Sequence, residues 1–187
     1  NAIVHQIAWM VFNNVDTVVL TIFCDLKVVS VYAVYKMINN YMFTFAKIPY
    51  DSFSFRLGQL YNNDKERFKK FINCAELFSG AICFILFTVS LCLTKDFVAL
   101  YTKGVNDISY VDTTLSVLFV GVELLNYMRT PMLSTINYAA HFRQTRMSAI
   151  IEVGINVVVS IAGVIYLGIY GVLLGSLAAL SYRTVHV

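Results

Sequence analysis

FINCAELFSGAICFILFTVSLCL, residues 71–93, is a nearly unbroken apolar run in which Glu76 is the one charged side chain. A helix of about 20 mostly apolar residues is long enough to cross the hydrocarbon core of a bilayer. Five further runs of this kind flank it, and no ten-residue segments alternate between apolar and polar residues as membrane barrels require. The sequence therefore predicts an all-α, polytopic membrane bundle of six spans, at about residues 3–24, 28–50, 71–93, 111–138, 147–167 and 169–182.

The overall composition excludes most soluble classes of protein. The 187 residues are 58% hydrophobic and 13% charged, with a mean hydropathy of +0.69. An average soluble domain is about 25% charged, and a compact soluble fold needs polar side chains over most of its surface. These values argue against a soluble enzyme, a disordered tail and a nucleic-acid-binding module.

The four cysteines form no CxxC pair, so neither a zinc site nor a thioredoxin-like motif is present in the sequence. We expect them to be buried free thiols that pack as small apolar side chains. We expect no metal and no cofactor.

Lysine and arginine are distributed unequally between alternate linkers, which sets the expected orientation. The two end segments and the linkers on their side of the bundle hold eight basic residues, and the opposite linkers hold three. The eight-residue side is predicted to be cytoplasmic, with both ends of the chain. Because the chain starts at Asn1 without Met and shows no signal peptide, we expect a piece of a longer protein. The eight are Arg56, Lys65, Arg67, Lys69, Lys70, Arg143, Arg146 and Arg183; the three are Lys27, Lys95 and Lys103.

Polar and charged residues also lie inside the predicted spans, where each ionisable group costs at least about 2.5–3.5 kcal/mol. Lys36 and Lys47 are three helical turns apart and therefore share one face, with Asn40 and Thr44 near it. Acids on three spans and bases on two predict one shared aqueous cavity. Two alternatives stay open: internal ion pairs and hydrogen bonds that fix the packing, or snorkelling of Lys47 and Glu152. The residues concerned are Asn13, Asn14, Asp16, Lys36, Asn40, Thr44, Lys47, Glu123, Asn126, Arg129, Ser148, Glu152, Asn156 and Ser160.

Proline, glycine and tyrosine residues give three further expectations. Pro131 lies inside the fourth span and predicts a bend, either in a helix that lines the cavity or as a passive kink. Gly171 and Gly175 form a small-xxx-small pair that predicts close helix packing. Tyr32 and Tyr35, near the lysines, are considered as surfaces on which a sugar stacks.

Four stretches resemble the bacterial polysaccharide transporters, the O-antigen and capsule repeat-unit flippases. They are NNVDTVVLTIFCDLKVVSVYAVY (13–35), NYAAHFRQT (137–145), AIIEVGINVVVS (149–160) and GIYGVLLG (168–175). The same superfamily includes the multidrug and toxin extrusion transporters and the lipid II flippase. The resemblance implies two six-helix lobes around a central cavity, with residues 1–187 as most of the C-terminal lobe and the N-terminal lobe missing.

The resemblance also implies a function without enzyme activity: alternating access that moves undecaprenyl-pyrophosphate-linked oligosaccharide units across the bacterial inner membrane. The implied partners are this substrate, membrane lipids, and polysaccharide polymerase and chain-length proteins, but no nucleic acid. The alternatives are a cation-coupled multidrug exporter and a membrane glycosyltransferase or polymerase. The predicted substrate-binding residues are Asn14, Asp16, Lys36, Asn40, Lys47, Arg129, Glu152 and Asn156; those predicted to bind a coupling H⁺ or Na⁺ are Asp16, Glu123 and Glu152.

Overall fold

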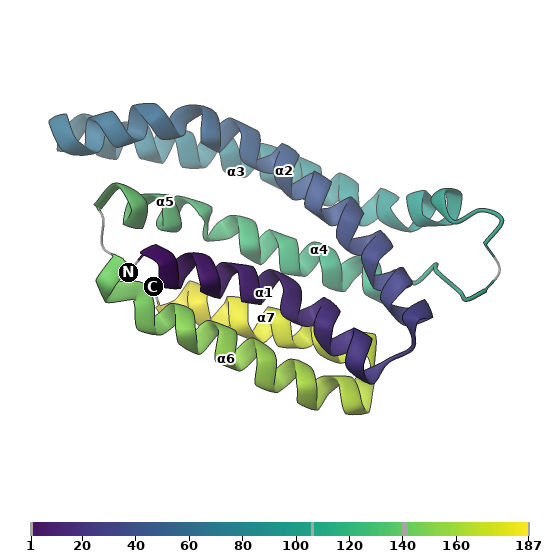
Figure 1. Ribbon diagram of the computed structural model, residues 1–187. Helices are drawn as coiled ribbons and strands as arrows, with labels where there is room; N and C mark the ends of the chain where they lie inside the picture. Colours follow the sequence, from purple (N-terminus) through teal and green to yellow (C-terminus); the bar gives the residue numbers. More distant parts are fainter. Residues whose placement is uncertain (1, 106, 140–141, 187) are drawn as a thin grey trace.

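The computed structural model describes residues 2–105, 107–139 and 142–186, and these ranges fold into α-helices and connecting turns without a strand (Figure 1). The predicted all-α class is therefore confirmed. The helices are α1 Ala2–Phe23, α2 Leu26–Asn63, α3 Lys65–Tyr101, α4 Thr113–Met128, α5 Thr130–Ala139, α6 Phe142–Leu167 and α7 Ile169–His186.

The charged stretch 60–70 was expected as a linker, but it is helical except at Asp64. The stretch contains neither glycine nor proline, so nothing in it interrupts the two helices. The side chain of Asp64 caps α3 by accepting a hydrogen bond of 3.0 Å from the Arg67 N–H. With 38 and 37 residues, α2 and α3 are each about 55 Å long, which exceeds a hydrocarbon core of about 30 Å.

The predicted fourth span is broken in two, as Pro131 suggested. Helix α4 ends at Met128, Arg129 has φ −84° and ψ −8°, and α5 begins at Thr130. Proline supplies no backbone N–H, so the helical hydrogen bonding is interrupted at this point. The six expected spans therefore correspond to seven helices.

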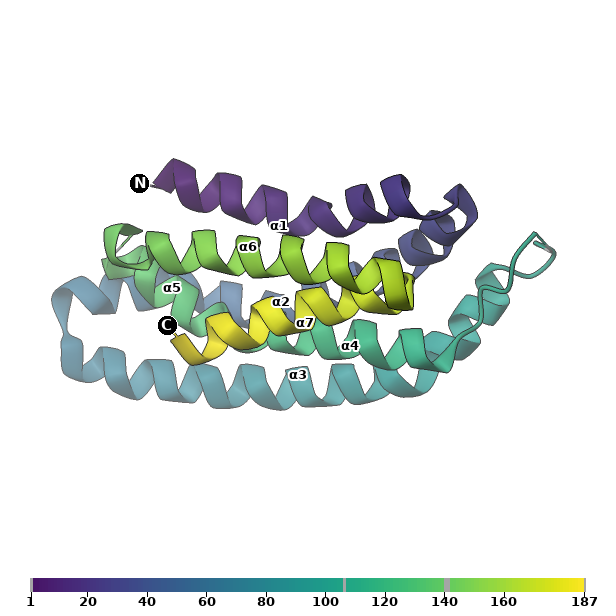
Figure 2. The same cartoon turned by 90° about the horizontal axis from the view of Figure 1, so that it is seen from below.

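The helices form two groups with α4 and α5 between them (Figures 1 and 2). The long helices α2 and α3 run as an antiparallel pair, while α1, α6 and α7 pack together on the other side. Both ends of the chain lie at the same end of the bundle in both views, as an even number of crossings requires. The linker between α3 and α4 lies at the opposite end.

Helices α6 and α7 approach so closely that only glycine fits at their contact. A Cβ atom added to Gly171 would lie 2.1 Å from the Gly163 carbonyl, and one added to Gly175 would lie 2.3 Å from the Ser160 hydroxyl. Gly168, with φ +58°, makes the tight turn between the two helices. The packing interpretation of Gly171 and Gly175 is therefore confirmed.

Within the described ranges, three helices are long and apolar enough to cross a membrane by length and composition: Gln6–Phe23 in α1, Lys65–Tyr101 (α3) and Met147–Leu167 in α6. The apolar part of α7, Ile169–Val185, is shorter. Large apolar side chains on α3, such as Leu77 (78% exposed) and Phe84 (72% exposed), cover its outer face. These features identify a membrane protein.

The cysteines differ from the expectation of four buried thiols. Cys83 is buried, Cys24 is half-buried, and Cys74 and Cys92 are exposed on α3. The reason is that α3 buries only one narrow stripe, which includes Ser79, Cys83 and Ser90. All four thiols are free.

Candidate functional site

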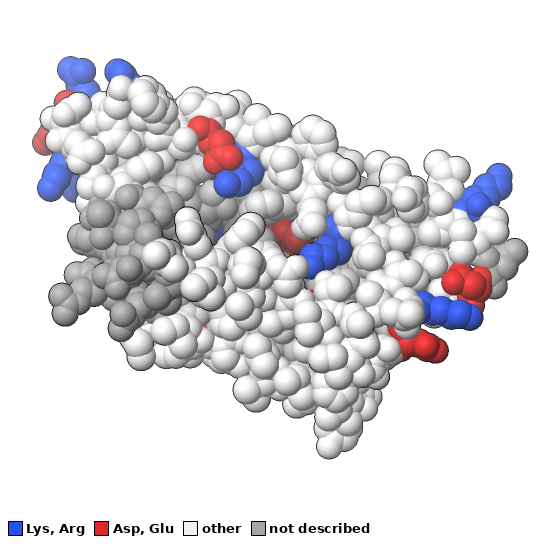
Figure 3. Space-filling view, in the orientation of Figure 1, with Lys and Arg blue, Asp and Glu red and all other residues white. Residues whose placement is uncertain are grey.

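A cavity of about 690 Å³ lies between α1, α2, α4 and α5. In the space-filling view the charged atoms gather mainly at the ends of the molecule, with small blue and red groups midway along an otherwise uncharged face (Figure 3). The cavity lining is Trp9, Asn13, Asn14, Lys36, Asn40, Phe43, Thr44, Lys47, Glu123, Asn126, Arg129, Thr130, Leu133 and Ser134.

Six of the nine predicted site residues line this cavity. Lys36, Asn40, Thr44 and Lys47 all lie on its wall, so the predicted polar face of α2 is confirmed. The other three predicted residues, behind the wall, are described below. The six are Asn14, Lys36, Asn40, Lys47, Glu123 and Arg129.

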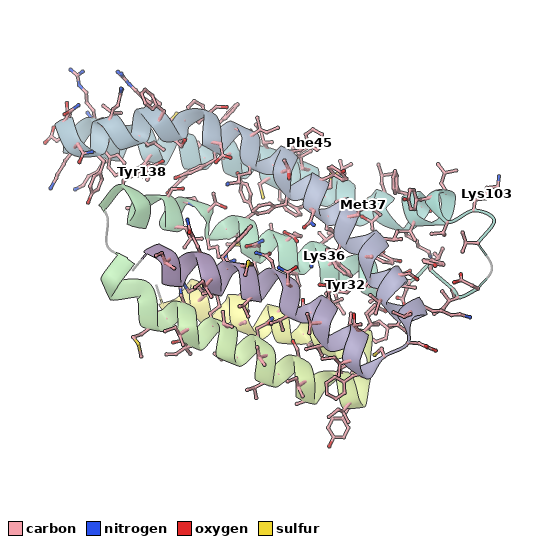
Figure 4. The ribbon with its side chains drawn as sticks, in the orientation of Figure 1. Tyr32, Lys36, Met37, Phe45, Lys103 and Tyr138 are labelled. Atoms are coloured by element: carbon pink, nitrogen blue, oxygen red, sulfur yellow. The ribbon has the colours of Figure 1, made fainter. Side chains whose placement is uncertain are left out.

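Lys36 bridges α2 and α1 at the edge of the cavity. Its Nζ donates to the Asn13 carbonyl at 2.6 Å and to the Thr17 hydroxyl at 3.3 Å, and it lies 5.5 Å from the centre of the Tyr32 ring. Figure 4 shows Lys36 and Tyr32 in this region of α2. Both hydrogen-bond partners are neutral oxygen atoms, and they hold the Lys36 side chain at the cavity wall.

Lys47 lies farther along the same face of α2, toward the end of the bundle where the chain termini lie. Its Nζ is 3.5 Å from a carboxylate oxygen of Asp51, one turn along the helix, and both side chains are about half exposed, at 40% and 55%. Such an exposed pair contributes little to stability. The Lys47 ammonium is therefore available to a ligand in the cavity.

Arg129 lines the cavity but is only 6% exposed, and it links the cavity to a buried chain of charges. Its Nε donates to Asn126 at 3.0 Å, and Asn126 in turn donates to Glu123 at 3.3 Å. Its Nη1 forms an ion pair with Glu152 of α6, which is 7% exposed. Glu152 therefore does not snorkel: it is a buried counterion behind the cavity wall.

Arg183 was counted among the cytoplasmic linker residues, and the structure corrects this. Helix α7 continues beyond Tyr182, and the Arg183 side chain is 2% exposed inside the bundle, 3.6 Å from Glu152. The helical spacing of the buried residues on α7 (Ser176, Ala179, Leu180) continues to Arg183, so extending the apolar face past the predicted end of the span would have found it. The basic residues of the predicted cytoplasmic side become seven, so the predicted orientation is unchanged.

Asp16 and Asn156 belong to a second buried group, between α1, α6 and α7. Tyr32 donates to Asp16 Oδ2 at 3.1 Å, Ser176 donates to the same oxygen at 2.7 Å, and Asn156 donates to the Ser176 hydroxyl at 2.9 Å. Asp16 Oδ1 and Asn156 Oδ1 are buried and have no hydrogen-bond partner among the described residues. Ser176 was not predicted as a site residue; a lone serine in an apolar helix is too common to single out.

Tyr32 and Tyr35 are not sugar-stacking surfaces. Their side chains are 4% and 0% exposed, and both rings pack on Phe119, with centroid distances of 5.1 and 5.6 Å. The Tyr35 hydroxyl instead bonds the backbone at Tyr110 and Asp112. Tyr35 therefore anchors the linker that precedes α4.

Comparison of the chain with protein-family models, with curated proteins and with solved structures finds no match.

Proposed function

We propose that this chain forms one lobe of a bacterial inner-membrane transporter, a flippase for undecaprenyl-pyrophosphate-linked oligosaccharide units used to build O-antigen, capsule or exopolysaccharide. The observation that carries the proposal is the cavity in an apolar helical bundle. Among the described residues it is lined by Lys36, Lys47 and Arg129 but by a single carboxylate, that of Glu123. The resemblance of residues 13–35, 137–145, 149–160 and 168–175 to these transporters supports the same function.

The chemistry of such a substrate fits this lining. A pyrophosphate head is anionic and is bound by lysine and arginine through charge-assisted hydrogen bonds. Sugar hydroxyls both donate and accept hydrogen bonds, which the amides of Asn14 and Asn40 supply from the cavity wall. Moving such a head through hydrocarbon without these partners would carry a large desolvation cost. The polyprenyl chain needs no such path, since it is as apolar as the surrounding lipid.

The coupling ion would bind behind the cavity in this proposal. Asp16 Oδ1 and Asn156 Oδ1 are buried oxygen atoms without a hydrogen-bond partner in the described part of the chain. The Asp16 carboxylate can accept H⁺ or bind a small cation, and the Asn156 amide oxygen can coordinate a cation. The Tyr32 hydroxyl donates to Asp16, and Tyr32 lies on α2 together with Lys36. In this proposal, ion binding at Asp16 acts on the conformation of the cavity through this contact.

The alternative is a cation-coupled multidrug exporter, which shares an intramembrane carboxylate site such as that of Asp16. The three basic side chains of the cavity oppose it, because an organic cation entering there would meet like charges.

The two functions are distinguished in cells that lack the full-length protein. We expect these cells to accumulate lipid-linked oligosaccharide and to lose surface polysaccharide, with unchanged sensitivity to cationic drugs. Restoring the wild-type protein should reverse the accumulation. Greater drug sensitivity with normal surface polysaccharide would favour the multidrug exporter and contradict the flippase.

A further inference from the structure

Glu152 lies between two buried arginines that come from different helices. Arg129, at the break between α4 and α5, pairs with its Oε1, and Arg183 of α7 has Nη1 3.6 Å from its Oε2. All three residues are at most 7% exposed. In the described part of the chain, a single carboxylate therefore pairs with two guanidinium groups, at a place in the bundle from which water is largely excluded.

Arg183 makes fewer hydrogen bonds to Glu152 than its guanidinium can donate. A distance of 3.6 Å is an ion pair but too long for a hydrogen bond. Its Nε and Nη1 atoms have no hydrogen-bond partner within the described ranges. A guanidinium offers five N–H donors in a planar fork that matches a carboxylate, so Arg183 has the capacity to hold Glu152 alone.

Arg129 has a different position, because it reaches both Glu152 and the cavity. It lies on the cavity wall, which Arg183 does not. It also occupies the junction between two helices, where Pro131 removes a backbone hydrogen bond and allows the backbone to bend. Of the two arginines, Arg129 is the one placed to exchange Glu152 for an anionic ligand.

We infer that Arg183 is a positioning residue, the standing counterion of Glu152 that releases Arg129 to bind an anionic group in the cavity. When the cavity is empty, the Arg129 guanidinium stays in its ion pair with Glu152. When a phosphate group enters, Arg129 turns to it, and Arg183 closes on Glu152 and keeps that buried carboxylate paired. Without Arg183, the exchange would leave the buried Glu152 carboxylate without a counterion. The free-energy cost of an unpaired buried charge strongly disfavours the exchange in that case. The identity of the anion, a pyrophosphate, rests on the proposed function.

The first experiment needs no ligand. It measures thermal unfolding of the full-length protein in detergent for Arg129→Gln, Arg183→Met and the double variant. Each single variant should unfold at a temperature close to that of the wild type, because the remaining arginine pairs with Glu152. The unfolding temperature of the double variant should fall by far more than the sum of the two single decreases. Adding Glu152→Gln to the double variant should restore the unfolding temperature. Additive losses would overturn the inference.

The second experiment measures binding of undecaprenyl pyrophosphate, with uncharged undecaprenol as the control ligand. Arg183→Met should weaken binding of the pyrophosphate by at least about tenfold and leave undecaprenol unchanged, since Arg129 then stays with Glu152. Adding Glu152→Gln to this variant should restore the affinity, which a merely structural role of Arg183 would not produce. The exposed Arg56→Met is a control with the same change in charge.

The outcomes separate the inference from the proposed function. A wild-type protein that does not prefer the pyrophosphate to undecaprenol overturns the proposed function and the anion exchange together. A wild-type preference that Arg183→Met leaves intact, or that Glu152→Gln fails to rescue, overturns the inference alone.

Discussion

Individual polar residues divide into those that hold the bundle together and those that face the cavity, and the sequence alone does not separate them. The intramembrane positions of Asp16, Lys36 and Glu152 are visible in the sequence because charges are rare in apolar runs. Their partners come from helices up to 160 residues away, as in the Ser176–Asp16 bond. Pairing across such distances depends on helix rotation, which an isolated sequence does not define.

Asp112, in the linker directly before α4, joins the start of α4 to α7. Its Oδ1 accepts hydrogen bonds from the Thr114 and Leu115 N–H groups at 2.7 and 3.2 Å, which caps α4, and its Oδ2 accepts one from the Tyr170 hydroxyl. Partial burial raises the pKa of Asp112, but the hydrogen bonds from Tyr170, Leu115 and Thr114 outweigh it and leave the pKa below its ordinary value.

We expect Asp112→Ala to destabilise the protein by about 1 kcal/mol at pH 7, the usual value of a helix cap. A lowered folded-state pKa contributes stability that is present above the ordinary value of about 3.9 and is lost as the pH falls through the lowered value. The difference in melting temperature between wild type and Asp112→Ala should therefore be constant from pH 7 to pH 5 and shrink below pH 4. The exposed Asp107→Ala is the control. A difference that grows on acidification would contradict this role.

The helices themselves follow closely from the sequence, and the deviations have physical causes. Apolar runs predicted a helix at each of the six positions, three of which are long and apolar enough to cross a membrane among the described residues, and Pro131 predicted the break in the fourth. The extensions of α2 and α3 into the charged stretch 60–70 were missed, because charge indicates exposure to water and says little about whether the backbone is helical. The same rule misplaced Arg183, whose charge is buried by α7 and paired with Glu152.

The contact between α6 and α7 gives a test at this scale. Gly171→Leu should prevent the two helices from packing, because even a Cβ atom there would overlap the Gly163 backbone. Gly154→Leu makes the same change on the exposed side of α6, where a Cβ would meet nothing within 4 Å. We expect the first variant to express poorly or to lose its cooperative melting transition, and the second to melt as the wild type does. Equal melting of the two would refute the close approach.

At the scale of the whole molecule, the bundle places basic side chains in an apolar environment, with one acid, Glu123, on the cavity wall and others behind it. Lys36, Lys47 and Arg129 line the cavity, while Glu152 and Asp16 lie outside it. The sequence predicted a shared polar cavity, and the structure places six of the nine predicted residues on it. It did not predict that Asp16, Asn156 and Glu152 would lie behind the wall, since residues on one helical face can point to different neighbours along its length.

The contacts of the cavity residues determine which substitutions are suitable for testing the cationic cavity. Lys36→Gln with Arg129→Gln was the natural choice from the sequence, but Arg129 also pairs with Glu152 behind the cavity wall, so its removal changes that buried ion pair as well as the cavity. Lys36 and Lys47 are better targets, because their partners are neutral atoms or an exposed carboxylate.

The most direct measurement is the transfer of a fluorescent undecaprenyl-pyrophosphate oligosaccharide between leaflets of vesicles that contain the purified full-length protein. The wild type and the exposed control Lys69→Gln, Lys70→Gln should both transfer it. Lys36→Gln, Lys47→Gln, which carries the same loss of charge, should transfer it at the rate of protein-free vesicles while keeping a cooperative melting transition that shows it is folded. Transfer by this cavity variant at the wild-type rate would contradict a cationic translocation cavity.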